Sequence, residues 1–137
     1  GGGQGWALLR PYRRTFPFEE RGAGAVVVSM VLENEVKKAF ERYRKALEEA
    51  LEATLERSRA KEALEARIAQ GLLSGEVQGR NAEEREAKAR ALYAELYRAL
   101  AEAEERYQRA KTALEIAKAY TEEVGLLARL VSEGVRL

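Results

Sequence analysis

The feature that most constrains the fold is a repeat of apolar side chains along residues 33–70, a stretch with neither proline nor glycine. The steps between its positions alternate between four and three residues, which is typical of a helix packed in a coiled coil. The repeat therefore predicts a helix over about residues 31–70. Its positions are Val36, Phe40, Tyr43, Leu47, Ala50, Thr54, Arg57, Lys61, Leu64 and Ile68.

Two basic residues, Arg57 and Lys61, interrupt this apolar repeat. One interpretation is structural: their aliphatic stems cover Leu96 and Tyr93 of a second helix while the charges reach water. The other is functional, a basic notch that binds a partner. An interruption of this kind also helps to define the register of two packed helices.

The repeat returns after an interval that contains Gly71, Gly75 and Gly79. Glycines at this density stop a helix and form a loop. Asn81, followed three positions later by Glu84, is typical of a helix N-cap. We expect a loop over residues 71–81 and a second helix over about residues 82–133. The repeat positions of that helix are Ala89, Tyr93, Leu96, Leu100, Ala103, Tyr107, Ala110, Leu114, Ala117, Thr121, Val124, Ala128 and Val131.

Two long helices joined by a short loop become antiparallel neighbours. The expected fold class is therefore all-α, a long antiparallel two-helix coiled-coil hairpin over residues 30–137. A register in which most pairs set a large side chain against a small one places Tyr43 beside Ala110 and Leu64 beside Ala89.

Residues 1–29 differ in character, because they hold both prolines and the only tryptophan. We expect an irregular arm rich in arginine, aromatic residues and glycine. Three interpretations stay open: extraneous or mis-annotated sequence, an arm packed on the helices, or a basic arm that contacts nucleic acid. The contact residues of that last interpretation are Trp6, Arg10, Tyr12, Arg13 and Arg14.

Missing residue types exclude most catalytic and metal sites. The chain contains no cysteine and no histidine, and its 23 acidic residues are all glutamate. Disulfides, cysteine or histidine metal sites and histidine-based triads are therefore excluded. We expect no enzymatic activity, no catalytic residue, no cofactor and no metal.

Charge and hydropathy bear on location and partners. A net charge of +1 makes no case for affinity of the whole chain for nucleic acid or membranes. The sequence has neither an apolar run long enough to span a bilayer nor the pattern of a signal peptide, so we expect a cytoplasmic protein. A surface rich in glutamate and arginine, with few asparagines, is typical of a heat-loving source.

The far end of the second helix carries more apolar side chains than the first helix can cover. In the expected register, residues 33–70 reach only to about Lys118, and Ala25–Leu32 covers part of the remainder. The uncovered side chains predict self-association as a homodimer, or docking of a protein partner. They are Val124, Leu126, Leu127, Leu130 and Val131.

The stretches GRNAEEREAKARALYAEL and AEAEERYQRAKTALEIAKAY carry a resemblance. With Gly79, Asn81, Arg85 and Ala87 at the entry to a long alanine-rich helix, the chain resembles small uncharacterised coiled-coil proteins of bacteriophages and integrated elements. The resemblance implies a mobile-element origin and brings no catalytic residues. The function expected from the sequence is a non-enzymatic helical-hairpin scaffold or adaptor. The alternative is a nucleic-acid-associated protein that uses the basic aromatic arm.

Overall fold

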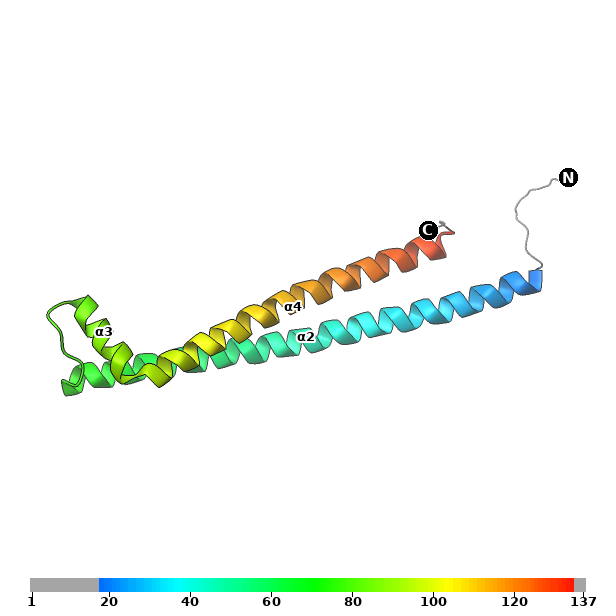
Figure 1. Cartoon of the computed structure of the whole chain (residues 1–137). Coiled ribbons are helices and arrows are strands. Elements are labelled where there is room, and N and C mark those ends of the chain that lie inside the picture. Colours follow the sequence, from blue (N-terminus) through cyan, green and yellow to red (C-terminus); the bar gives the residue numbers. More distant parts are fainter. Residues whose placement is uncertain (1–17, 135–137) are drawn as a thin grey trace. The chain divides into compact units, whose positions relative to one another are not determined.

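The computed structural model describes residues 18–134 of the chain, with side chains from residue 23 onward. These residues form three α-helices and no strand: α2 (Phe18–Ser74), α3 (Ala82–Leu92) and α4 (Ala94–Ser132) (Figure 1). The expected all-α class is confirmed for this part of the chain.

Helix α2 is longer at both ends than the sequence repeat predicts. It begins at Phe18, so the prediction of an irregular arm over residues 1–29 is wrong for residues 18–29, while residues 1–17 lie outside the described residues. Both prolines precede Phe18, and glutamates at positions 19 and 20 favour the positive end of the helix dipole. At the other end α2 continues through Gly71 and stops at Gly75, whose φ of +83° is the left-handed conformation that favours glycine.

The predicted cap of the second helix is present. The Asn81 side chain accepts a hydrogen bond of 2.8 Å from the Glu84 N–H, which satisfies one of the free amides at the start of α3. The Glu84 carboxylate in turn accepts from the backbone N–H of Arg80 at 3.0 Å and from its guanidinium at 2.8 Å. These bonds to Arg80 lower the pKa of Glu84 below its ordinary value of 4.5.

Replacing Asn81 by alanine should remove the side-chain acceptor of this cap. We expect the free energy of unfolding to fall by about 1 kcal/mol, measured by urea denaturation followed by circular dichroism. Asn81→Ser is the matched control and should retain most of the stability, because serine is also a strong N-cap residue. Equal losses in both variants would contradict a capping role.

The predicted single helix over residues 82–133 is wrong, because the helix is interrupted at Tyr93. Tyr93 has φ −112° and ψ 33°, outside the helical range, and it separates α3 from α4. Its N–H still donates to the Ala89 carbonyl at 2.8 Å, and its own carbonyl accepts from the N–H of Leu96 at 2.9 Å. The interruption is therefore confined to one residue.

The described chain divides into two compact units, each of which has its own packing. Unit 1 contains residues 18–40 and 121–134, and unit 2 contains residues 41–120. In unit 2, a buried cluster at the loop end combines Leu64 of α2, Val77 of the loop, Ala89 of α3 and Tyr93. The predicted pair closest to the loop, Leu64 and Ala89, therefore lies in one cluster.

The buried positions of α2 differ from the predicted ones by one residue in each heptad. Ala39, Ala46 and Ala53 are buried, whereas Phe40 and Leu47 are 48% and 47% exposed. Alanine every seventh residue allows a second helix to approach closely. In unit 1, for example, the Thr121 hydroxyl donates to the backbone carbonyl of Ala39 at 3.2 Å. The prediction that Phe40 and Leu47 belong to the buried face of α2 is wrong, because side chains of this size would hold the helices further apart.

The predicted register also fails beyond the loop end. Arg57 stacks over Tyr107, with its guanidinium 3.8 Å from the ring centroid, rather than covering Leu96 and Tyr93. Arg42 stacks over Tyr120, which comes ten residues later in α4 than Ala110, the predicted neighbour of Tyr43. The register shifts because the chain turns at Tyr93: α3 packs near the end of α2, and α4 begins only after the turn.

Candidate functional site

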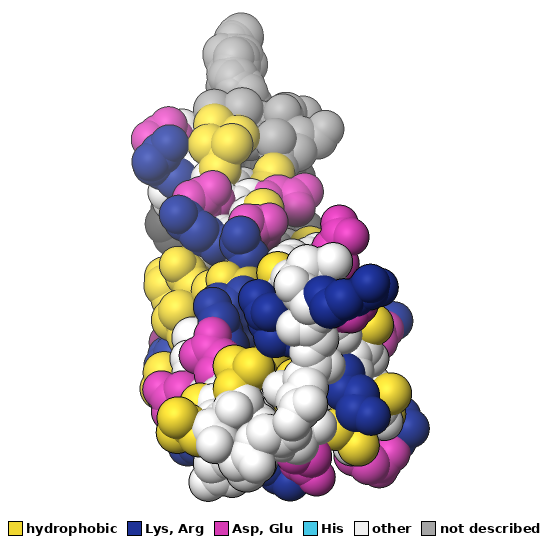
Figure 2. Space-filling view, turned by 90° about the vertical axis from the view of Figure 1, so that its left-hand side faces the viewer, with side chains coloured by type: hydrophobic (Ala, Val, Ile, Leu, Met, Phe, Trp, Pro, Cys, Tyr) yellow, Lys and Arg dark blue, Asp and Glu magenta, His cyan; other side chains and the backbone are white. Residues whose placement is uncertain are grey.

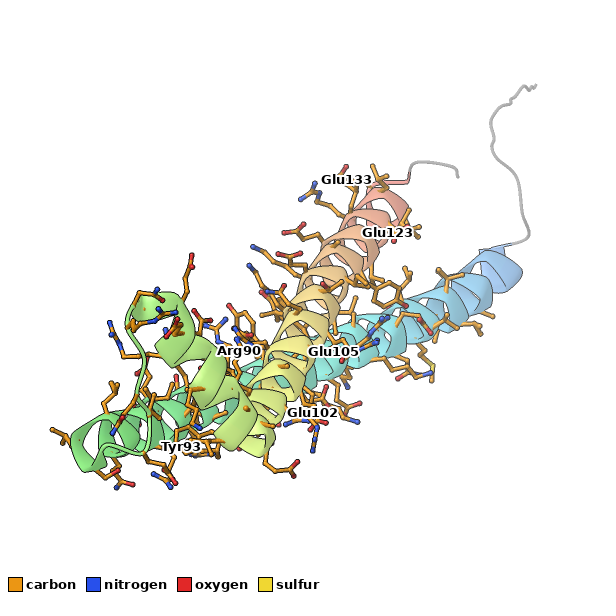
Figure 3. The ribbon with its side chains drawn as sticks, turned by 60° about the vertical axis from the view of Figure 1, so that its left-hand side comes forward. Arg90, Tyr93, Glu102, Glu105, Glu123 and Glu133 are labelled. Atoms are coloured by element: carbon orange, nitrogen blue, oxygen red, sulfur yellow. The ribbon has the colours of Figure 1, made fainter. Side chains whose placement is uncertain are left out.

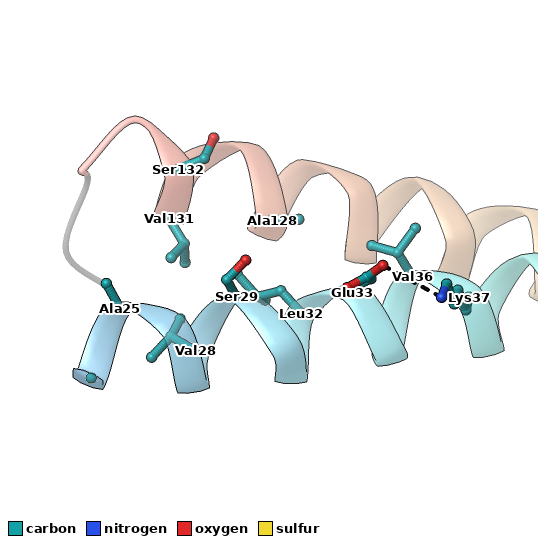
Figure 4. A pocket seen from close by; sticks show the side chains of 11 residues that line it. Ala25, Val28, Ser29, Leu32, Glu33, Val36, Lys37, Ala128, Val131 and Ser132 are labelled. Atoms are coloured by element: carbon teal, nitrogen blue, oxygen red, sulfur yellow. Dashed lines mark ion pairs between the residues drawn. The ribbon is translucent and has the colours of Figure 1, made fainter. Parts of the chain in front are cut away.

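An apolar groove lies in unit 1 between the beginning of α2 and the end of α4. It has a volume of about 1010 Å³. Figure 4 shows Val131 pointing from α4 toward α2 across this groove. Its two charged lining residues, Glu33 and Lys37, form an ion pair with each other at 3.4 Å. The lining residues are Gly24, Ala25, Val28, Ser29, Leu32, Glu33, Val36, Lys37, Ala128, Val131 and Ser132.

Apolar side chains are also exposed on the faces of α2 that do not line the groove. Val26, Val27 and Met30 are each 59% exposed, and Val31 is 53% exposed. The cause is in the sequence: residues 22–32 contain no charged side chain, so this part of α2 is apolar on all its faces. One neighbouring helix can cover only one face of α2. We call these four residues the outer face of α2.

The predicted interface residues on α4 fall into two groups. Val124 is buried within unit 1, and Leu130 and Val131 are half-buried. Leu126 and Leu127 are 47% and 39% exposed. The expectation that all five side chains are uncovered is wrong for Val124, because the observed register brings the nearby Thr121 to Ala39, so this part of α4 lies beside α2 further than the predicted register allows. The outer face of α2 was missed as exposed surface, although the absence of charge over residues 22–32 was a visible signal.

The other residues singled out from the sequence do not form a site. Trp6, Arg10, Tyr12, Arg13 and Arg14 lie outside the described residues. Arg57 is half-buried, whereas Lys61 is exposed and its neighbour Ala60 is half-buried. The two basic residues therefore do not share a buried stripe. Around the α3 corner, the face in Figure 2 shows lysine and arginine side chains interspersed with glutamates.

A polar cluster lies at the turn between α3 and α4, where Figure 3 labels Tyr93. The Tyr93 hydroxyl donates to Glu76 Oε1 at 2.6 Å, and Arg67 Nη2 donates to the same oxygen at 3.1 Å. The Arg67 guanidinium lies 4.5 Å from the centroid of the Tyr93 ring. The Glu76 carboxylate thus accepts two hydrogen bonds, one from Arg67 of α2 and one from Tyr93 at the turn.

This cluster changes the acidity of both partners. The hydrogen bond from Tyr93 lowers the pKa of Glu76 below its ordinary 4.5; burial opposes this, and the charges of Arg67 and Lys88 lower it further. The same hydrogen bond raises the pKa of Tyr93 above 10.0, and burial adds to the rise. The Glu76 carboxylate therefore favours the folded turn above its ordinary pKa, and this contribution is lost as the pH falls through its lower folded pKa.

Residues 18–134 contain neither a metal-binding cluster nor a membrane-spanning helix. No group of three or more histidine, cysteine, aspartate or glutamate side chains is arranged to hold a metal ion there. None of the described helices is long and apolar enough to cross a membrane.

Comparisons with known proteins give no family to which the chain can be assigned. No protein-family model, no curated protein and no solved structure matches it.

Proposed function

We propose that this chain is a non-enzymatic scaffold protein, a helical hairpin that self-associates through the apolar surface of unit 1. The observation that carries the proposal is the exposure of the outer face of α2, where Val26, Val27 and Met30 are each 59% exposed. Contiguous apolar surface of this kind on a water-soluble helix marks a place where another chain binds.

The contacts within unit 2 support an antiparallel arrangement of the helices as a coiled-coil hairpin. Arg42 of α2 stacks over Tyr120 of α4, and Arg57, further along α2, stacks over Tyr107, which comes earlier in α4. An ion pair of 2.9 Å between Glu56 and Arg106 lies next to the contact between Arg57 and Tyr107. Contacts that advance along one helix while they retreat along the other are expected of antiparallel neighbours.

A second copy of the chain is the partner that best fits the outer face of α2. Ala23, Val27, Met30 and Asn34 follow each other at steps of four, three and four residues, and none of them lines the groove. This is the spacing that one helix needs to pack against another in a coiled coil. The identical stripe on a second molecule has the same spacing, so the two stripes can pack against each other. A closed dimer is the simplest symmetric assembly of this kind.

Sedimentation velocity at micromolar concentration tests the proposal. We expect a dimer for the unaltered chain and a monomer for the double variant Val27→Glu, Met30→Glu, because four glutamates would be desolvated in the interface. The dissociation constant should rise by about tenfold or more. The matched control is Leu73→Glu, in unit 2, where the leucine is 89% exposed and a charge should not change the mass.

Two results would contradict the proposal. The first is an unaltered chain that stays monomeric at these concentrations. The second is a dimer that the double variant leaves intact, which would place the interface elsewhere. Sedimentation of the double variant Leu127→Glu, Leu130→Glu then tests separately whether α4 contributes to the interface.

A further inference from the structure

The helix between Ala82 and Ser132 is interrupted at a point where the local sequence favours continuity. From residue 82 to residue 124 the chain contains neither proline nor glycine. The residues around Tyr93 are mainly alanine, leucine, glutamate and arginine, which are strong helix formers. Sharp breaks in helices usually coincide with proline, with glycine or serine pairs, or with an inserted group. The cause of this break must therefore lie in tertiary contacts.

A single residue, Tyr93, separates α3 from α4 at the break. In a continuous helix, the N–H groups of Ala94, Glu95 and Leu96 would donate to the carbonyls of Arg90, Ala91 and Leu92. Here the helical pattern restarts at the Tyr93 carbonyl, which accepts from the N–H of Leu96 at 2.9 Å and of Tyr97 at 3.1 Å. A change of conformation at one residue would thus join α3 and α4.

Side-chain contacts of Tyr93 hold the bent conformation. Tyr93 is only 6% exposed, and its ring lies in the cluster of Leu64, Val77 and Ala89. Its hydroxyl donates to Glu76 at 2.6 Å, and Glu76 is itself held by Arg67 at 3.1 Å. A tyrosine in a continuous helix could not keep its ring and hydroxyl in these positions while the backbone straightened around it.

The end of α2 is shaped to receive this side chain. A Cβ at Gly71 would collide with the Tyr93 hydroxyl and would lie 2.7 Å from a methyl group of Val77. The Gly71 carbonyl also accepts from the Val77 N–H at 2.9 Å, which keeps the loop beside the ring. The loop, the end of α2 and the turn thus converge on one tyrosine.

We propose that Tyr93 and Glu76 form a latch that holds unit 2 in a bent state, in exchange with a straight state in which α3 and α4 form one helix. Opening the latch withdraws Tyr93 from the cluster and uncovers Leu64 and Val77. A partner that binds the straight helix or the uncovered cluster would shift the population toward that state. All the moving parts belong to unit 2, so this inference does not depend on self-association through unit 1.

Distance measurements between two spin labels test the latch, and a chain without cysteine allows the labels to be placed cleanly. Labels at Glu83→Cys in α3 and Glu104→Cys in α4 occupy exposed positions. In a continuous helix their backbone separation is about 31 Å, since each residue adds roughly 1.5 Å. We expect a shorter distance in the otherwise unaltered chain.

Tyr93→Phe removes only the hydroxyl, and Glu76→Ala removes its acceptor. In each variant we expect the ratio of straight to bent molecules to rise by about tenfold, the effect of losing a hydrogen bond to a charged group. Tyr97→Phe is the matched control: this ring packs beside the same cluster, but its hydroxyl has no hydrogen-bond partner in the described part of the chain, so the distances should not change.

Two outcomes would overturn the proposal. One is a labelled chain that gives only the separation of a continuous helix. The other is a short distance that both Tyr93→Phe and Glu76→Ala leave unchanged, because the bend would then be held by packing alone. Circular dichroism of each variant confirms that the helices are retained.

Discussion

Replacing Leu64 by aspartate should lower the free energy of unfolding by about 3–5 kcal/mol. Leu64 is 5% exposed and lies in the cluster with Val77, Ala89 and Tyr93. A carboxylate there would lose its water and would lie among the apolar side chains of this cluster. Urea denaturation of the folded chain, followed by circular dichroism, measures the change.

Leu47→Asp is the informative control, because Leu47 belongs to the same predicted repeat as Leu64. The side chain of Leu47 is 47% exposed, so aspartate keeps much of its hydration. We expect a loss of less than about 1 kcal/mol. Equal losses at the two positions would mean that the repeat read from the sequence, rather than the alanine face, is the buried one.

Gly71→Ala should destabilise the chain even though glycine lies inside a helix. Alanine would raise the helix propensity of α2 by as much as about 1 kcal/mol. However, its methyl group would collide with the Tyr93 hydroxyl and lie 2.7 Å from a methyl group of Val77. Overpacking of this kind costs about 1–3 kcal/mol, so we expect a net loss of about 1–2 kcal/mol.

Gly125→Ala is the matched substitution with the opposite expected sign. Gly125 lies inside α4, and a Cβ there would meet no atom within 4 Å. The gain in helix propensity is then unopposed, and we expect stabilisation of about 0.5–1 kcal/mol. Thermal unfolding of both variants compares the signs directly. Stabilisation by Gly71→Ala would show that the end of α2 does not need glycine to accommodate Tyr93.

Periodicity and local chemistry in the sequence determined much of the second half of the chain. The positions of the repeat between Ala89 and Val131 are all buried or half-buried. The cap formed by Asn81 was also readable, because a side-chain acceptor three residues before a free amide acts within a single turn. The absence of charge over residues 22–32 was equally visible, and it underlies the outer face of α2.

Only the tertiary structure decided which stripe of α2 is buried. Alanines at positions 39, 46 and 53 compete on the helix surface with the larger side chains one residue later. Hydrophobicity favours burial of the larger side chains, whereas close approach of a second helix favours burial of the alanines. The choice depends on the partner surface, which no local pattern contains.

Tertiary contacts also decided where the helix breaks at Tyr93. The residues around it favour a continuous helix, and its bend depends on Glu76 and Arg67, which are 17 and 26 positions earlier in the chain. The register of α4 depends in turn on that bend, so the pairing of Arg57 could not be predicted from the repeat. Periodicity shows which face of a helix is apolar, whereas contacts between distant residues determine where the helix turns and what it meets.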